Sequence, residues 1–201
     1  MLQPTKKSSK ASGRTQAQRR AETTQKVLLC ATEIFAYKGY QETNVEDIAR
    51  HSGLTIRPIY HYFGNKKQLF EAVVEEQEKN LTEQLEQHFE NKLSQHQTPS
   101  IEEGWQIFLQ MAKQPQFRQT VLIDAPIVLG RERWSRCAVS TQVQLWVGHI
   151  FSDSNALQQE IISRILFSAL AEIAMLITHH EQAEQVEIEI QQLLKFLLPE
   201  K

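Results

Sequence analysis

Apolar residues recur every three or four positions along most of the chain, which is the spacing of one face of an α-helix. The pattern predicts long helices at about 15–38 and 66–93, with two short helices between them. Gly39 follows the first long helix, and Gly64-Asn65 precedes the second. Glycine and asparagine at these places are typical of helix ends and caps. No strand pattern of useful length is present, so the sequence predicts an all-α fold.

The pattern continues beyond a polar connector at 94–99. Asp124 begins a new helix in this interpretation, with Pro126 in its first turn, where a missing N–H removes little. The organisation predicted is a helix-turn-helix unit over 14–64 and a larger helical bundle over 65–201. The helices expected in the bundle after the long one lie at about 100–113, 116–123, 124–150, 156–178 and 181–198.

Charge is unevenly distributed along the chain, although the formal net charge is only −2. Residues 1–70 hold 12 basic and 5 acidic side chains, whereas residues 71–201 hold 10 basic and 19 acidic ones. Such an asymmetry indicates a nucleic acid or another anionic partner for the basic end. Residues 1–13 lack apolar periodicity and are predicted to form a disordered basic arm. That arm is either a solubilising tail or a segment that follows a DNA backbone.

The sequence also disfavours several classes of protein. Its first residues are polar and basic and lack the apolar core of a signal peptide. The apolar stretch at 161–177 is interrupted by Arg164 and Glu172, so we expect no membrane span. Cys30 and Cys137 are too few for a disulfide framework, and we expect reduced thiols, although one bridge remains an alternative. These observations predict a soluble, cytoplasmic protein.

No catalytic motif is visible, so we predict no enzyme, no catalytic residue and no cofactor. The His179-His180-Glu181 segment suggests a metal site at first sight. Adjacent residues of a helix point about 100° apart, however, and His179 and His180 cannot share an ion there. His180 and Glu184 can, but one such pair is usually a solvated surface, and we predict no metal.

The two short helices, at about 44–51 and 55–63, form a helix-turn-helix candidate around Ser52-Gly53-Leu54. Ile59 and Phe63 are four residues apart and are predicted to face inward. The opposite face of the second helix then presents polar groups to a DNA major groove. Arginine can pair with a guanine, histidine can meet a base edge, and tyrosine can bind phosphate. The residues of this predicted face are Thr55, Arg57, Tyr60, His61 and Tyr62, with Lys66 beside the backbone.

The segment at about 15–75 resembles the TetR family of transcriptional regulators. The motifs that carry the resemblance are Thr43-Asn44-Val45-Glu46-Asp47-Ile48-Ala49, Ser52-Gly53-Leu54-Thr55, Tyr60-His61-Tyr62-Phe63 and Asn65-Lys66. The resemblance implies a three-helix DNA-binding domain that a long fourth helix joins to a ligand-binding, dimerising bundle. By position it implies DNA contacts from Thr43, Asn44, Thr55, Ile56, Arg57, Tyr60, His61, Tyr62 and Lys66. Pro58 and Ile56 depart from the usual pattern. Base preference is therefore not carried over, and Ile56 is a candidate for contact with a thymine methyl.

The helix expected at 156–178 is too apolar for a single buried stripe, with 15 apolar residues among positions 156–177. We expect it to cover a second surface, in a two-fold dimer built from this helix and the last one. The alternative is a monomer whose loops cover these faces. The predicted interface residues are Ile161, Ile165, Ala169, Ile173, Ile190, Leu194 and Leu197.

A ligand pocket is expected between the long fourth helix and the last two helices. Large apolar residues and a few polar groups are the usual lining of such a pocket. Each apolar candidate is also a candidate for ordinary core. Asp124 is alternatively a helix cap, and Arg131 and Arg133 are alternatively surface residues. The predicted lining is Trp105, Phe108, Met111, Phe117, Asp124, Trp134, Trp146 and His149.

These expectations together predict a homodimeric repressor of an inverted-repeat operator, released from double-stranded DNA by an unidentified small-molecule effector. A ligand-independent architectural DNA-binding protein is the alternative. The acidic bundle argues against that alternative, since DNA wrapped around it would be repelled.

Overall fold

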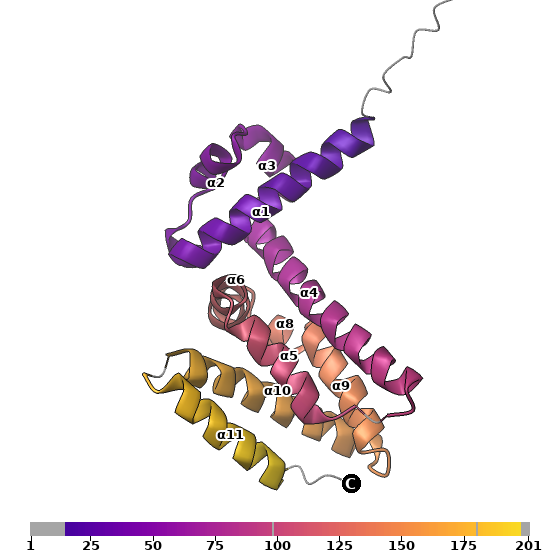
Figure 1. Cartoon of the computed structure of the whole chain (residues 1–201). Coiled ribbons are helices and arrows are strands. Elements are labelled where there is room, and N and C mark those ends of the chain that lie inside the picture. Colours follow the sequence, from indigo (N-terminus) through magenta and orange to yellow (C-terminus); the bar gives the residue numbers. More distant parts are fainter. Residues whose placement is uncertain (1–14, 98, 180, 198–201) are drawn as a thin grey trace, which may run out of the picture.

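The computed structural model describes residues 15–97, 99–179 and 181–197, and it is all-α, with no strand among these residues (Figure 1). The fold class predicted from the sequence is confirmed. The basic arm predicted at 1–13 lies outside the described residues. The helices are α1 Gln16–Glu42, α2 Val45–Ser52, α3 Ile56–Phe63, α4 Lys66–Ser94, α5 Ile101–Ala112, α6 Pro115–Phe117, η1 Arg118–Asp124, α7 Ala125–Val128, α8 Arg131–Ser135, α9 Ala138–Ile150, α10 Ala156–His179 and α11 Ala183–Leu197.

Helices α1, α2 and α3 form a small unit around one apolar core, and α4 begins beside it (Figure 1). Val27 and Phe35 of α1, Ile48 of α2 and Ile59 of α3 are all buried. Phe70 of α4 completes the cluster, with its ring edge-on to that of Phe35 at 5.1 Å between centroids. The start of α4 is therefore part of the same core as the short helices.

Helix α1 starts where the sequence predicts but ends later. Thr15 and Gln18 form a reciprocal capping box at its start. At Gly39 the backbone turns to φ 75°, a left-handed value that favours glycine, and the helix breaks. One further turn then runs to Glu42. The predicted end near residue 38 thus marks the break rather than the last helical residue.

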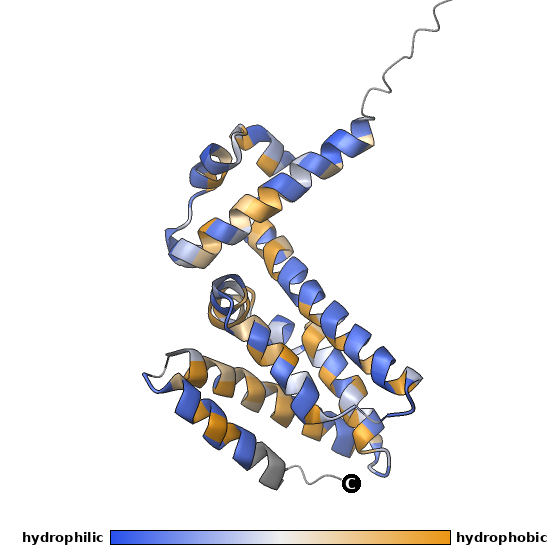
Figure 2. Cartoon of the chain, in the orientation of Figure 1, coloured by the Kyte–Doolittle hydropathy of each residue, from blue (hydrophilic) through white to orange (hydrophobic). Residues whose placement is uncertain are grey.

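Helix α4 leads from the small unit into the bundle, where it runs beside α9 and α5 (Figure 1). Its inner face is apolar, as at Leu81 and Leu85, and its outer face is polar (Figure 2). Helix α10 packs against α9, α5 and α11. One helix therefore belongs to both parts of the molecule.

The segment between α5 and α9 differs from the prediction of two helices at 116–123 and 124–150. Helices α6, η1 and α7 follow one another without a gap, and η1 is a π-helix. In the π-helix the Ala125 N–H donates to the Thr120 carbonyl, five residues earlier. Pro126 has no N–H, so the next carbonyl, that of Val121, lacks a helical partner and accepts a hydrogen bond from the Trp134 indole at 3.1 Å instead. Gly130 (φ 92°) then separates α7 from α8.

By length and composition, residues 156–178 of α10 would also suit a membrane span. Core helices of soluble proteins pass the same test, and α10 packs against other helices of the bundle. Both cysteines are free, in agreement with the expected thiols.

Candidate DNA-binding surface and ligand cavity

The turn between α2 and α3 is held by backbone hydrogen bonds. Gly53 adopts a left-handed conformation (φ 65°) and its N–H reaches the carbonyls at the end of α2. The Leu54 N–H donates to the Ala49 carbonyl at 2.9 Å, and the Ser52 hydroxyl donates to the same oxygen at 3.0 Å. These bonds set the angle between the two helices, which is what a helix-turn-helix requires.

Ion pairs attach α2 to α1. The Lys38 ammonium lies 2.7 Å from the Asp47 carboxylate, and Arg50 pairs with the same carboxylate at 2.8 Å. The hydrogen bond from Lys38 lowers the pKa of the Asp47 carboxyl below its ordinary value. The carboxylate thus stays charged and connects the two helices.

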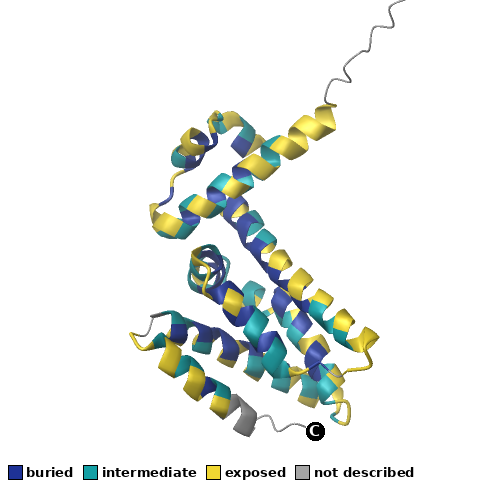
Figure 3. Cartoon of the chain, in the orientation of Figure 1, coloured by how far each residue is buried: buried dark blue, intermediate teal, exposed yellow. Residues whose placement is uncertain are grey.

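Helix α3 exposes the face that the sequence assigns to DNA (Figure 3). Ile59 is buried against the core, whereas Arg57, Tyr60 and His61 are exposed. The Tyr62 side chain is half-buried, and the His61 and Tyr62 rings lie 5.0 Å apart between centroids. The face therefore combines one cation with hydrogen-bonding aromatic rings.

Asn44 and Thr55 occupy the N-cap positions of α2 and α3. Both side chains are exposed, and neither makes a capping hydrogen bond. The first N–H groups of each helix are available to an anion, and helix N-termini favour phosphate. Both residues are thus placed suitably for contact with a DNA backbone.

Three predicted DNA contacts are placed differently. Thr43 is completely buried and its hydroxyl donates to the Gly39 carbonyl at 2.7 Å, which contradicts the prediction for its side chain. Ile56 is half-buried and packs on the core. The Lys66 ammonium donates to the Gln41 carbonyl at 3.2 Å and lies 4.3 Å from the centre of the Tyr40 ring. Burial lowers the pKa of Lys66.

Arg20 lies on the same surface, although no motif in the sequence indicated it. Its guanidinium lies 5.6 Å from the centre of the Tyr62 ring. Arg19 and Lys26 of α1 are also exposed, and the Lys26 ammonium lies beside Gly53 in the turn between α2 and α3. The cluster of basic residues before the first apolar position was the available signal.

Asp124 connects the two parts of the molecule. Its carboxylate accepts the Tyr40 N–H at 2.8 Å and the Gln119 side-chain amide at 3.2 Å. The break at Gly39 removes Tyr40 from the regular hydrogen bonding of α1, and the carboxylate supplies a partner. Asp124 makes no capping bond to α7 and does not line the apolar cavity, so both predicted roles are wrong.

An apolar cavity of about 40 Å³ lies between α4, α5, α9 and α10. Trp105, Phe108 and Trp146 line it, in agreement with the prediction. Leu85 of α4 and Phe167 of α10 line it as well. A drug-sized ligand needs several hundred cubic ångströms, so these helices must separate before one can enter.

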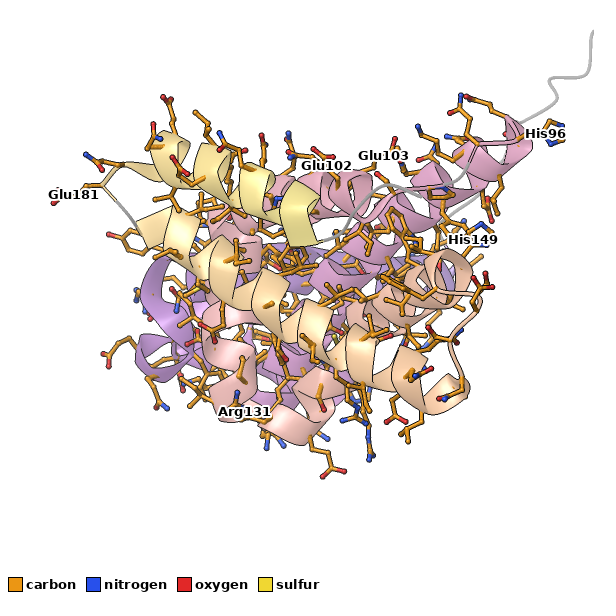
Figure 4. The ribbon with its side chains drawn as sticks, turned by 90° about the horizontal axis from the view of Figure 1, so that it is seen from below. His96, Glu102, Glu103, Arg131, His149 and Glu181 are labelled. Atoms are coloured by element: carbon orange, nitrogen blue, oxygen red, sulfur yellow. The ribbon has the colours of Figure 1, made fainter. Side chains whose placement is uncertain are left out.

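The other predicted lining residues have different partners. Phe117 is fully buried edge-on to Phe108, and the Met111 sulfur accepts the side-chain amides of Gln84 and Gln114. The Trp134 ring lies 4.6 Å from the Phe167 ring between centroids, and its indole N–H donates to the Val121 carbonyl. Figure 4 shows His149 at the outer edge of the bundle, where it is exposed. These residues support the walls or the surface rather than the cavity.

The two arginines considered as pocket groups also lie elsewhere. Arg131 is exposed (Figure 4). Arg133 of α8 forms an ion pair with Glu78 of α4, whose side chain is only 3% exposed. Burial raises the pKa of Glu78, while the hydrogen bond from Arg133 opposes that rise. This pair links α8 to α4.

An exposed apolar stripe, Leu157, Ile161, Ile165, Ala169 and Leu176, follows one face of α10. It contains three of the predicted interface residues, while Ile173 is half-buried. Ile190 of α11 is buried within the chain, which contradicts its assignment to an interface. The side chains of Leu194 and Leu197 lie outside the described residues, as does His180 of the alternative metal pair. Among the described residues no group of three metal-binding side chains occurs.

Comparison with known proteins agrees with this architecture. Residues 27–73 match the family of bacterial regulatory proteins called tetR, and residues 98–200 match the tetracyclin repressor-like C-terminal domain. The second match alone spans more than half of the chain. No curated protein matches at a significant level.

Solved structures have the same fold. A TetR-family transcriptional regulator from Pectobacterium atrosepticum is 26% identical, with a TM-score of 0.64 over 92% of this chain and 96% of that one. A transcriptional regulator from Aquifex aeolicus is 22% identical (TM-score 0.63; 88% and 99% covered). The regulator FadR from Bacillus subtilis, in complex with stearoyl-CoA, is 14% identical (TM-score 0.67; 88% and 99% covered). The latter two resemble the chain in fold alone. With its helix-turn-helix unit, its helical bundle and both matching domains, the chain belongs to the TetR family of DNA-binding transcriptional regulators.

Proposed function

We propose that the protein is a homodimeric repressor, acting in the cytoplasm, that binds an inverted-repeat operator and leaves it when a small ligand enters the bundle. The exposed polar face of α3 carries this proposal. This face belongs to a helix-turn-helix whose turn is held by backbone hydrogen bonds and whose first helix is joined to α1 by the Lys38–Asp47 ion pair. The unit lies in the part of the chain with an excess of basic residues. A rigid, basic surface of this kind suits the major groove.

The stripe on α10 supports the dimer. Ile161 is 48% and Ile165 62% exposed, although a monomer gains by burying such side chains. A two-fold axis at this stripe brings the same residues of two copies together. Two copies of α3 then read half-sites about one helical turn, or a multiple of it, apart.

Helix α4 supports the coupling to a ligand. It begins beside α3 and contributes Leu85 to the cavity, so a change of cavity volume displaces a helix that the DNA-binding unit shares. The ligand must bind the DNA-free form more tightly than the bound form, since otherwise no equilibrium shifts. The complex of FadR with stearoyl-CoA shows that one protein of this fold holds a large ligand.

Base recognition by Arg57 tests the proposed function. DNA selected from a random pool by the wild-type protein should contain an inverted repeat. Arg57→Ala should relax the preference at one base of each half-site, at a cost of about 1–3 kcal/mol. Arg131→Ala, an exposed arginine of the bundle, is the matched control and should select the wild-type sequence. An Arg57→Ala variant that weakens binding to every sequence equally contradicts the base contact.

A further inference from the structure

The cavity between α4, α5, α9 and α10 has apolar walls with three polar side chains. These are Gln142, Trp105 and Trp146, and no charged residue is among the described residues that line it. The amide nitrogen of Gln142 already donates to the Glu86 carboxylate of α4. The Gln142 amide has one further N–H, and the other side-chain N–H groups among the residues that line the cavity are those of the two indoles.

Neither of these indoles has a hydrogen-bond partner among the protein groups that the structure describes. Trp105 is 1% and Trp146 is 5% exposed, and both Nε1 atoms are buried without an acceptor. Trp134 offers the contrast within the same bundle, since its Nε1 donates to the Val121 carbonyl at 3.1 Å. A buried donor without a partner destabilises the fold, and few native groups are left in this state.

Packing holds Trp146 in place. A Cβ atom at Gly104 would lie only 2.3 Å from Cζ3 of Trp146 and less than 3 Å from two neighbouring ring atoms, Cη2 and Cε3. The six-membered ring is therefore pressed against α5, and the nitrogen lies on the other ring of the indole. Phe89 covers Trp146 from α4, with 5.7 Å between the ring centroids. The donor is thus held before any ligand arrives, which reduces the entropy cost of binding.

We propose that this cavity accepts an uncharged, mainly apolar molecule that carries a carbonyl oxygen, and that the indole N–H groups of Trp105 and Trp146 donate to that oxygen. The inference rests on the proposed function, because it takes the cavity to be the effector site. A carboxylate is a poor candidate, since no cation lines the cavity to offset its desolvation. A pure hydrocarbon leaves both donors unpaired, as they are without ligand.

Tryptophan side-chain NMR signals report directly on the two donors. The chain contains three tryptophans, so the full-length ¹⁵N-labelled protein gives three indole N–H signals, which single Trp→Phe variants assign. The probes are acetophenone and α-methylstyrene, which replaces the carbonyl oxygen by a CH₂ group of similar size. Acetophenone should move the Trp105 and Trp146 proton signals downfield, and α-methylstyrene should not. Equal shifts with both probes, or no shift with acetophenone up to its solubility limit, overturn the proposal.

A nearly isosteric substitution provides the second test. β-(3-Benzothienyl)alanine replaces the indole N–H by sulfur with little change of shape. At position 105 or 146 it should leave the melting temperature unchanged or raise it, and weaken acetophenone binding about tenfold, the effect of one lost hydrogen bond. At position 134 it should lower the melting temperature, because that indole has a partner. A similar loss of stability at all three positions shows that the donors are already satisfied and overturns the proposal.

These titrations contain no DNA, so their outcome is separate from that of the operator experiment. If the indole signals fail to move while the protein still selects an inverted repeat, the proposed ligand class is wrong and the regulatory function stands. If the signals move as expected but no operator is selected, the proposed repressor function fails instead.

Discussion

The Asp47 carboxylate illustrates how one side chain organises the DNA-binding surface. It receives Lys38 from α1 and Arg50 from its own helix. The hydrogen bond from Lys38 lowers its pKa in the folded state relative to the unfolded state. A lowered carboxyl pKa stabilises the fold at pH values above the unfolded pKa, and this stability is lost as the pH falls through the folded pKa.

We therefore expect Asp47→Asn to flatten the acid side of the stability profile. Between neutral pH and about pH 3, the range of carboxyl titration, the melting temperature of the wild type should fall more steeply than that of the variant. Thermal unfolding followed by circular dichroism measures both profiles. Glu46→Gln, a change to an exposed carboxylate of the same helix, should keep the wild-type slope. Identical slopes for Asp47→Asn and wild type would show that the ion pairs contribute nothing.

At the scale of elements, α1 meets the bundle directly where it packs against η1 and α6. Gly39 has φ 75° and ψ 169°, and a Cβ there would lie 3.3 Å from the side-chain amide of Gln119. The break leaves the Tyr40 N–H without a helical partner, and the Asp124 carboxylate accepts a hydrogen bond from it. The backbone conformation of Gly39, the π-helix η1 and the hydrogen bond to Asp124 are therefore coupled.

Replacing Gly39 by alanine should destabilise the protein by about 1–3 kcal/mol, since a side chain strains this backbone conformation. Urea unfolding of the full chain measures the loss. Gly148→Ala is the matched control, because Gly148 lies inside α9 and a Cβ there meets its nearest neighbour, Gln159 Oε1, at an ordinary 3.6 Å. That variant should gain up to about 1 kcal/mol from the better helix former. If the two variants are equally stable, the strain argument at Gly39 is wrong.

At the scale of the whole molecule, the outer face of α10 remains apolar in the single chain. Leu157, Ile161, Ile165 and Leu176 are each about half exposed or more. They lie one helical turn apart or at multiples of it, so they share one face of the helix. A second copy of the chain is the partner that we propose for it.

Ile165→Glu should place two like charges near the two-fold axis and shift the protein to monomer at micromolar concentration. Analytical ultracentrifugation of wild type and variant tests this. Ile127→Glu on α7 is the control, because Ile127 is 75% exposed and lies outside the stripe. A wild-type protein that sediments as a monomer contradicts the proposed dimer, and an Ile165→Glu dimer shows that its interface lies elsewhere.

Three features were predictable from the sequence: the all-α fold class, the two short helices and the exposed face of α3. Each of them depends on residues that are only a few positions apart in the chain. Periodicity determines which face of α3 is apolar, and Gly53 and Gly64 mark its neighbouring turns. The cavity was predictable only in part. Trp105, Phe108 and Trp146 line it, but the equally apolar Phe117 and Met111 do not. Composition does not reveal which helix faces meet around the cavity.

Long-range partners account for the errors. Asp124 was expected to line the pocket or, alternatively, to cap a local helix, yet its partner Tyr40 is 84 residues away. Thr43 is buried because the break at Gly39 presents a carbonyl to its hydroxyl, and Ile190 is buried because that side of α11 packs into the bundle. Local pattern thus establishes the helices and their amphipathic faces, since capping and periodicity act over one or two turns. Which faces meet, and which donors such as Trp105 and Trp146 stay unpaired, follows from the packing of distant segments.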